Sequence, residues 1–520
     1  MSENGQTPPS ARGREGVVSL DADTCYRALC ARDGRFDGVF FVAVKTTGIY
    51  CRPVCRARTP APDRCVFYRT PVEAERDGFR ACFRCRPELA PGNGPVDSVP
   101  RLVEQAVARI DAGFLNEGSL DELAEALGVT GRHLRRAIRT ELGVSPVALA
   151  QSRRLALAKQ LLQDTALPLA EVAFASGFAS VRRFNALFQA RFGRPPSALR
   201  REHAADGAPA ALVLRLDYRA PLDWDALLGF LAGRAIPGAE EVATGIYRRT
   251  VRLAGASGWI EVQRDPSPQE TLRATVSLSL ASVLMQVVAR LRGLFDLDAH
   301  PAAICAHLAR DPALAPLLER HPGLRVPGAF DGFETAVRGI LGQQVSVRAA
   351  TTLSGRLIER FGEPLETPHP GLRRLFPRPD VLARASEDDV AGLGMPGARA
   401  RTVIALARAV AGSELRLDRV GRAGPTDVVR ERLQALPGVG DWTAQYIAMR
   451  VLGWPDAFPA SDLGLRHALG GLSAREIERQ AEPWRPWRAY AAMHLWTSLT
   501  PAVSRRSDRE TPPATGGQGR

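Results

Sequence analysis

Four cysteines in two close pairs, Cys51 with Cys55 and Cys82 with Cys85, constrain this chain more than any other feature. An insert long enough for a strand and a helix separates the pairs. This spacing is typical of a four-thiolate zinc site, in which each pair occupies a tight turn. The N-terminal segment has no apolar stretch of the kind found in export signals, so we expect thiols and a metal rather than disulfides.

Three arginines, Arg52, Arg56 and Arg58, lie next to the first cysteine pair in the stretch TTGIYCRPVCRAR. The chain carries a formal net charge of +13, almost entirely from arginine, because Lys45 and Lys159 are the only lysines. Such a basic excess favours nucleic acid as the partner. The spacing alone leaves two interpretations open: a structural zinc clip, or a zinc site in which one cysteine also reacts.

Two copies of a helix-turn-helix pattern follow. The segment SLDELAEALGVTGRHLRRAIRTELGVSP combines a capping box, Ser119 with Glu122, a turn at Gly128 and an arginine-rich second helix. The segment LPLAEVAFASGFASVRRFNALFQARFGRPPSALR repeats the plan with its turn at Gly177. Second helices of such units enter the major groove, where a side chain either reads a base or only contacts phosphate. The candidate DNA contacts are Arg132, His133, Arg135, Arg136, Arg182 and Arg183.

A helix-hairpin-helix pattern lies near the C-terminus, in LQALPGVGDWTAQYIAMRVLG. Gly438 and Gly440 allow the backbone to approach a phosphate, and the next helix offers unpaired N–H groups to it. Such a hairpin by itself indicates only binding to the DNA backbone. Asp462 follows in DAFPASDLGLRHAL, directly ahead of another helix, where an aspartate is either a helix cap or a catalytic carboxylate.

The cysteine-rich region, DGVFFVAVKTTGIYCRPVCRAR and then GFRACFRCRPE, resembles the N-terminal zinc domain of the Ada-type adaptive-response proteins. In that family the first cysteine of the first pair irreversibly accepts a methyl group from a DNA methylphosphotriester. The resemblance implies that Cys51 is the acceptor. It also implies that Zn²⁺ is held by Cys51, Cys55, Cys82 and Cys85. Methylation removes one negative charge from a DNA-facing site, which tightens binding.

The tandem helix-turn-helix resembles that of AraC-type regulators, and the C-terminal region resembles the AlkA-type 3-methyladenine DNA glycosylase II. The second resemblance rests on PLDWDALLGFLAGRAIPG, LRVPGAFDGFETAVRGILGQQVSV, LGMPGARA and WRPWRAYAAMHLW, in that order. It implies that Asp462 is catalytic and that Trp442, Tyr446 and Trp496 form a pocket for an electron-poor alkylated base. Trp442 and Tyr446, four residues apart, share one helix face.

The chain also departs from some relatives. Glycosylases of this superfamily that nick the strand use a lysine just after the hairpin, where this chain has Trp442; no lysine follows Lys159, which implies a monofunctional enzyme. Cys305 is the only cysteine of the region, so a cysteine-ligated iron–sulfur cluster is excluded. Gln344 occupies the position of an apolar wedge and is a further DNA-contact candidate. No Pro-Cys-His-Arg motif of an alkylguanine methyltransferase domain is present.

The predicted fold is multidomain and mainly α. Strand-like runs such as ALVLRLDYRA, GIYRRTVRL and TLRATVSLSL precede helical periodicity in the C-terminal region. We expect these parts: a disordered tail (1–18), a small α+β zinc domain with four cysteine ligands (19–92), an all-α tandem helix-turn-helix domain (98–203), an AlkA-type α+β N-terminal subdomain (211–293), an all-α helix-hairpin-helix glycosylase domain (294–500) and a second disordered tail (501–520).

The resulting hypothesis is a cytoplasmic protein, with no membrane partner, that acts on double-stranded DNA. It would accept methyl groups from phosphotriesters, regulate transcription together with RNA polymerase, and excise bases such as 3-methyladenine after flipping them. Two alternatives remain open from the sequence. One is a transcription factor whose glycosylase domain is inactive, and the other is a glycosylase merely tethered to DNA by its N-terminal modules.

Overall fold

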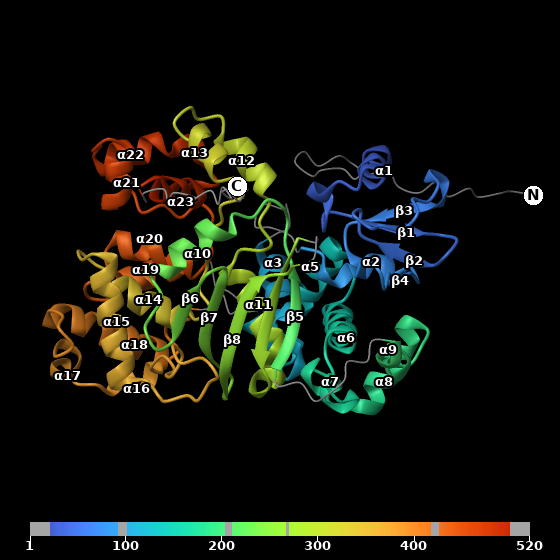
Figure 1. The fold of residues 1–520 in the computed structure, drawn as a ribbon, viewed down its shortest axis with the longest axis horizontal. Helices are drawn as coiled ribbons and strands as arrows, with labels where there is room; N and C mark the ends of the chain where they lie inside the picture. Colours follow the sequence, from blue (N-terminus) through green and yellow to red (C-terminus); the bar gives the residue numbers. More distant parts are fainter. Residues whose placement is uncertain (1–20, 92–100, 203–210, 267–269, 418–425, 500–520) are drawn as a thin grey trace, which may run out of the picture.

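The computed structural model describes residues 21–91, 101–202, 211–266, 270–417 and 426–499. Figure 1 shows the zinc and helix-turn-helix modules on one side of a central sheet and a helical module on the other. The predicted multidomain, mainly α fold is confirmed. The expected disordered tails, 1–18 and 501–520, lie outside the described residues. Among the helices that are described, none has the length and hydrophobicity of a membrane span.

The zinc module is a small four-stranded sheet in the order β3-β1-β2-β4, with β1 antiparallel to β2 and β3, and β2 parallel to β4. Helix α2 begins at a complete capping box formed by Thr70 and Glu73. The elements of this module are α1 (Ala22–Ala31), η1 (Gly34–Phe36), β1 (Phe41–Val44), β2 (Ile49–Cys51), η2 (Pro62–Arg64), β3 (Cys65–Tyr68), α2 (Pro71–Arg76), β4 (Arg80–Ala81) and η3 (Pro87–Leu89).

The second module is helical. The predicted capping box of Ser119 and Glu122 starts α4, and the two turn glycines, Gly128 and Gly177, have the positive φ angles of 70° and 84° that a side chain disfavours. Its elements are α3 (Arg101–Asp111), η4 (Phe114–Asn116), α4 (Leu120–Glu125), α5 (Gly131–Leu142), α6 (Pro146–Asp164), α7 (Leu169–Ala175), α8 (Val181–Phe192) and α9 (Pro196–Glu202).

A five-stranded antiparallel sheet in the order β5-β9-β8-β7-β6 forms the centre of the molecule. The predicted strands are confirmed, and the short β6 was not anticipated. Helices α10 and α11 pack with the sheet in one apolar cluster. The elements are β5 (Ala211–Asp217), α10 (Trp224–Ala232), β6 (Glu240–Ala243), β7 (Ile246–Leu253), β8 (Ala256–Arg264), β9 (Thr271–Ser277), η5 (Leu278–Val283) and α11 (Leu284–Leu294).

The C-terminal module is all-α, as predicted, and surrounds its own large apolar core. A buried ion pair attaches it to the sheet: Arg249 of β7 donates to Glu334 of α14 at 2.7 Å, and burial raises the pKa of that carboxyl to about 7. The elements are α12 (Pro301–Leu308), α13 (Ala315–Arg320), α14 (Gly332–Leu341), α15 (Val347–Phe361), α16 (Pro379–Arg384), α17 (Glu387–Ala391), α18 (Gly397–Ala411), α19 (Thr426–Gln434), α20 (Asp441–Arg450), α21 (Leu463–Ala468), α22 (Ala474–Gln480), η6 (Glu482–Trp484) and α23 (Arg488–Ser498).

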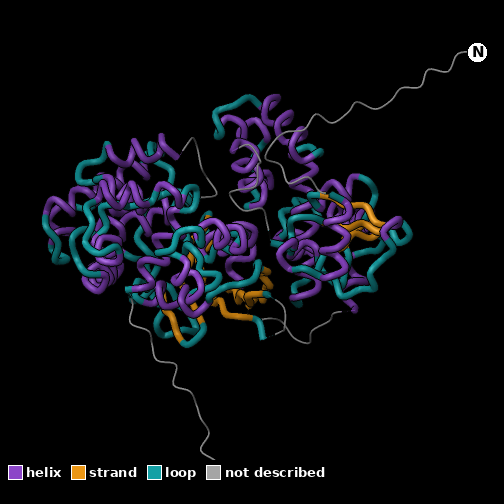
Figure 2. Tube along the Cα trace, turned by 90° about the horizontal axis from the view of Figure 1, so that it is seen from above, coloured by secondary structure: helices purple, strands orange, loops and turns teal. Residues whose placement is uncertain are grey.

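The first three modules share one apolar core. Phe41 and Tyr50 of the zinc module, Leu161 of α6 and Leu214 of β5 belong to a single buried cluster. Figure 2, seen from above, shows the strands of the zinc module and those of the central sheet as two separate groups with helices between them. The zinc module therefore packs directly against the helix-turn-helix module and the central sheet.

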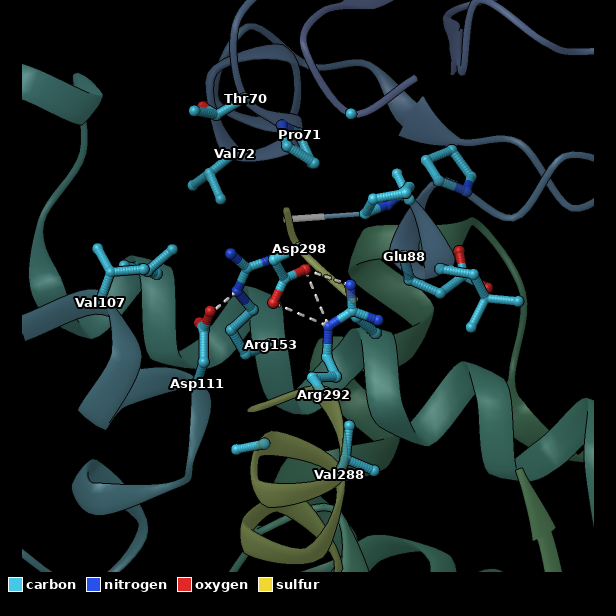
Figure 3. Close-up of a pocket in the computed structure, with 18 of the residues that line it drawn as sticks. Thr70, Pro71, Val72, Glu88, Val107, Asp111, Arg153, Val288, Arg292 and Asp298 are labelled. Atoms are coloured by element: carbon cyan, nitrogen blue, oxygen red, sulfur yellow. Dashed lines mark hydrogen bonds and ion pairs between the residues drawn. The ribbon is translucent and has the colours of Figure 1, made fainter. Parts of the chain in front are cut away.

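A cavity of about 370 Å³ lies at this junction, and Figure 3 shows its wall. Two ion pairs lie in this wall: Arg153 donates to Asp111 at 2.7 Å, and Arg292 donates to Asp298 at 3.1 Å. The cavity is lined by residues of the zinc, helix-turn-helix and sheet modules. Asp298, at the start of the C-terminal module, also lines it. Asp462 is not among the lining residues, so this cavity is distinct from the candidate catalytic site.

Candidate functional sites: a zinc centre and a half-buried carboxylate

The four predicted zinc ligands converge in the structure. The sulfurs of Cys51, Cys55, Cys82 and Cys85 all lie within 4.8 Å of one another. Cys51 ends strand β2, and a turn closed by the Cys55 N–H and the Arg52 carbonyl, at 3.1 Å, brings the second sulfur back to the first. Four converging thiolates are a donor set that Zn²⁺ prefers, and the protein binds Zn²⁺ here.

Backbone N–H groups are directed at three of the four sulfurs. Arg52 N–H donates to Cys85 Sγ at 3.4 Å, and the N–H groups of Ala57 and Cys85 are directed at the sulfurs of Cys55 and Cys82. A hydrogen bond stabilises a thiolate. Cys51 and Cys82 are equally exposed, at 8% each.

The second cysteine pair rests on helix α6. The buried ammonium group of Lys159 donates to the Cys82 carbonyl at 3.0 Å and to Glu88 at 2.8 Å. Arg86, just after the fourth ligand, donates from both terminal nitrogens to the carboxylate of Asp164, at 2.7 and 2.8 Å. The side chain of Glu88 is only 4% exposed. These contacts connect the zinc centre directly to the helix that joins the two helix-turn-helix units.

The two second helices, α5 and α8, repeat the same pattern of burial. Leu134 and Ile138 face the core in one, and Phe184 and Phe188 face it in the other. Both helices begin at a side-chain cap, Thr130 or Ser180, and end at a left-handed glycine. The predicted DNA contacts all lie on the exposed faces: Arg132, His133, Arg135, Arg136, Arg182 and Arg183.

The predicted hairpin leads into α20. Gly438 has a φ angle of 79°, and a Cβ there would lie 2.2 Å from Thr402 Oγ1, so a side chain cannot be accommodated. Gly440 is the N-cap of α20, and a Cβ there would meet nothing within 4 Å. The tight turn thus depends on Gly438. The surface next to Gly440 is open, as a phosphate-binding loop requires.

Asp462 is fixed by three donors. The indole N–H groups of Trp442 and Trp496 donate to its two carboxylate oxygens, Oδ2 and Oδ1, each at 2.8 Å, and Leu465 N–H donates to Oδ1 at 3.0 Å. Asp462 is the N-cap of α21 and is half-buried. Helix capping and a catalytic role are therefore compatible, since one oxygen binds the helix while both are oriented by the two rings.

Aromatic rings surround this carboxylate. Trp442 and Tyr446 stack with centroids 5.4 Å apart and planes 10° apart, and Phe230 of α10 stacks on Trp496 at 6.5 Å. Three of these four rings, those of Trp442, Tyr446 and Trp496, are predicted from the sequence. Phe230 is not, although it lies in a segment that carries the resemblance; only its position in GFLAGR could have indicated it.

Two guanidinium groups pack against these rings. Arg234 and Arg450 lie over the ring of Phe230, at 3.6 and 4.9 Å from its centroid, and Arg450 donates to the Tyr446 hydroxyl at 2.8 Å. Burial would raise the pKa of Tyr446, but Arg450 and the arginines beside it outweigh burial and lower the pKa. Burial lowers the pKa of Arg234 to about 10. Sequence reasoning missed both arginines.

The fold and these sites define a class of protein: a helix-hairpin-helix base-excision DNA glycosylase joined to a zinc- and helix-turn-helix-bearing DNA-binding half. Four family models match the chain in order. They are the metal binding domain of Ada (24–88), a helix-turn-helix domain (123–202), the AlkA N-terminal domain (213–331) and the HhH-GPD superfamily base excision DNA repair protein (337–486).

The chain belongs to the family of bifunctional transcriptional activator/DNA repair enzymes of the AlkA type. It is 43% identical over 500 residues to the probable bifunctional enzyme AlkA of Mycobacterium tuberculosis, covering 94% of this chain and 99% of that protein. It is 36% identical to DNA-3-methyladenine glycosylase 2 of Escherichia coli, over 54% of this chain and 95% of that one. It is 30% identical to the bifunctional activator/repair enzyme AdaA of Bacillus subtilis, over 35% of this chain and 86% of that protein.

Proposed function

We propose that this protein senses and repairs alkylated DNA with two separate chemistries in one chain. Cys51 accepts a methyl group from a DNA methylphosphotriester, the methylated protein regulates transcription, and the C-terminal half removes alkylated bases such as 3-methyladenine by hydrolysis. The observation that carries the proposal is the half-buried carboxylate of Asp462, oriented by Trp442 and Trp496 next to the hairpin.

The methyl transfer forms one bond and breaks one. The Cys51 sulfur forms an S–CH₃ bond, the O–CH₃ bond of the phosphotriester breaks, and an ordinary phosphodiester anion leaves. Cys51, Cys55, Cys82 and Cys85 would hold zinc, which would keep their thiolates ionised. The arginines Arg56 and Arg58 next to the site supply positive charge for the phosphate backbone. The thioether that forms carries no charge, so the zinc site loses one negative charge.

Base removal requires that the nucleotide leave the helical stack. As the N-glycosidic bond breaks, positive charge develops on the sugar, and the fixed carboxylate of Asp462 stabilises it electrostatically. The base departs with the bonding electrons, water adds to the sugar carbon, and that water releases one proton to the solvent. A base that already carries a positive charge, such as 3-methyladenine, needs no added proton to leave, and stacking on Trp442 and Tyr446 favours it by about 0.5–2 kcal/mol.

The regulatory part of the proposal depends on α5 and α8, which present their basic faces to solvent. Promoter binding by these helices, strengthened when Cys51 is methylated, would recruit RNA polymerase as the partner for activation.

A base-release assay tests the central claim. Full-length protein is incubated with duplex DNA treated with a methylating agent, and the released bases are separated and identified. We expect 3-methyladenine in solution and abasic sites in the DNA. Failure to release any alkylated base, from a preparation that binds the same DNA, would overturn the assignment.

A further inference from the structure

The two helix-turn-helix units have separate apolar cores. Leu134 and Ile138 of α5 belong to one buried cluster. Phe184 and Phe188 of α8 belong to another, which extends into the zinc module and the central sheet. Helix α6 connects the units and contributes residues to both clusters. A single connecting helix does not by itself fix the angle between two units, so a second contact is needed to hold α5 and α8 at one separation.

Helix α2 of the zinc module provides this second contact. It lies next to α6 (Figure 1). Its Val72 belongs to the buried cluster of the first unit, together with Leu142 at the end of α5. Its Ala74 belongs to the buried cluster of the second unit, together with Phe192 at the end of α8. One short helix of the zinc module is therefore part of both cores.

The next two residues of α2 make polar contacts with the same two helix ends. Arg76 donates to the carbonyl of Gly143, the C-cap of α5, at 3.3 Å. Glu75 forms an ion pair with Arg191, which lies in the last turn of α8. Helix α2 thus binds the C-terminal ends of both second helices, while the candidate DNA contacts of these helices remain exposed.

Glu75 joins three elements through one carboxylate. The Tyr50 hydroxyl of β2 donates to its Oε1 at 3.0 Å, and the Ser152 hydroxyl of α6 donates to its Oε2 at 2.7 Å. The side chain of Glu75 is 8% exposed, and that of its partner Arg191 is 24% exposed. A buried carboxylate is retained only where a cation and several donors satisfy it, as they do here. Because Tyr50 directly precedes Cys51, these contacts begin beside the zinc centre.

We propose that Glu75 is a positioning residue through which the zinc module fixes the separation and the relative angle of α5 and α8, so that the protein reads two DNA segments at a single spacing. This inference rests on the proposed regulatory function, and it gives the zinc module a role in DNA specificity that does not require methyl transfer.

The spacing of the two DNA segments can be changed in steps. In B-DNA one inserted base pair moves the second segment by about 3.4 Å and turns it by about 35°. Two helices held at a fixed separation cannot follow this displacement without losing base contacts. Two helices joined only by α6 can adjust to it. Tolerance of an inserted base pair therefore measures how firmly α2 holds α5 and α8.

The test needs a binding site, which selection from a random library of undamaged duplexes by the zinc-loaded full-length protein supplies. Footprints of Arg132→Ala and Arg182→Ala then identify the segments that α5 and α8 contact. One base pair is inserted between these segments, and the affinities for the two duplexes are compared. We expect the insertion to weaken wild-type binding about 10- to 100-fold, the cost of one to two base contacts, and to weaken binding by Glu75→Gln about 3- to 10-fold less.

Two further variants separate positioning from general damage to the fold. Arg191→Gln removes the other partner of the ion pair and leaves Glu75 bound to Tyr50 and Ser152, so it should show the same tolerance as Glu75→Gln, and the double variant should show no more. Asp63→Asn is the matched control, because it removes one negative charge from an exposed position of the zinc module. It should retain the wild-type sensitivity to the insertion.

The outcomes are distinguishable because the readout is a ratio of two affinities. A variant that is only less stable binds both duplexes more weakly by the same factor. Equal sensitivity of the wild type and Glu75→Gln to the inserted base pair would overturn the proposal, although the regulatory function would stand. A wild-type protein that enriches no sequence from the library would contradict the proposed regulatory function itself, and this inference with it.

Discussion

Arg52 and Asp217, 165 residues apart in sequence, form a buried ion pair between the zinc module and the central sheet. Arg52 directly follows the candidate methyl acceptor, and Asp217 ends strand β5. The guanidinium also pairs with Asp37, and Asp217 accepts a hydrogen bond from Thr271 at 2.7 Å. The side chains of Arg52 and Asp217 are only 10% and 6% exposed, so this contact fixes the zinc loop to the half of the protein that holds the glycosylase.

Arg52→Met should destabilise the protein substantially. The change leaves the carboxylates of Asp37 and Asp217 buried without their cation, a defect that typically costs about 3–5 kcal/mol. We expect a clear drop in the thermal midpoint. Arg35→Met is the matched control, because Arg35 pairs with Asp33 at the surface, where its side chain is 71% exposed, and such pairs contribute little. Equal shifts for the two variants would show that the junction does not form in solution.

Asp462→Asn should abolish most base release while DNA binding persists. The amide keeps the shape of the carboxylate but supplies no negative charge to the developing sugar cation, and we expect a loss of about a thousandfold, comparable to removing a major electrostatic group. Single-turnover release from methylated DNA measures it. Asp441→Asn removes a charge from the exposed start of α20 and should leave the rate per bound complex unchanged. Near-normal base release by Asp462→Asn would show that the Asp462 carboxylate is not catalytic.

The product DNA should carry intact abasic sites. Lys45 and Lys159 are the only lysines, and the ammonium group of Lys159 is buried against Cys82 and Glu88 in another module. No lysine therefore lies in the C-terminal module that carries Asp462. Reaction mixtures quenched with borohydride should show no trapped protein–DNA complex, and strands should break only after alkali. A trapped complex that maps to the C-terminal module would contradict this expectation.

Short motifs made the local structure predictable. The spacing of Cys51, Cys55, Cys82 and Cys85 predicted the thiolate cluster, because a zinc site requires four ligands in a tetrahedral arrangement. The capping box at Ser119 predicted the start of α4, because a capping box depends on residues close in sequence. The separation of four between aromatic residues likewise predicted that Trp442 and Tyr446 share a helix face, and the rings do stack.

Contacts between modules were not predictable in the same way. Nothing in a local pattern indicates that Arg52 meets Asp217, that Lys159 supports Cys82, or that Phe230 reaches Trp496. These contacts depend on which surfaces pack together, and that is decided by the shared apolar core rather than by periodicity. The resemblance predicts that Trp496 belongs to the base pocket, but only the structure gives the hydrogen bond from Trp496 to the carboxylate of Asp462.

Acid should destabilise the C-terminal module through His494. This side chain is 3% exposed on α23, and burial together with the nearby His321 lowers its pKa to about 4. The unfolded chain takes up this proton near pH 6.5 and the folded chain does not, so stability is complete above pH 6.5 and falls as the pH drops toward 4, by about 3 kcal/mol in total. His494→Leu should flatten the dependence of the thermal midpoint on pH in this window. An unchanged slope would show that other groups cause the loss of stability in acid.

Cys51 should be the residue that gains a methyl group. Incubation with methylphosphotriester DNA should add one methyl mass to the peptide carrying Cys51 while zinc remains bound, and Cys51→Ser should abolish the transfer because a hydroxyl is a far weaker nucleophile. Cys82→Ser is the matched variant: three thiolates and water can still hold zinc, and Cys51 stays methylatable. Loss of one negative charge should then tighten promoter binding, most strongly at low salt. Two results would contradict this prediction. One is methyl mass on Cys55, Cys82 or Cys85 instead of Cys51. The other is an equal promoter affinity before and after methylation at every salt concentration.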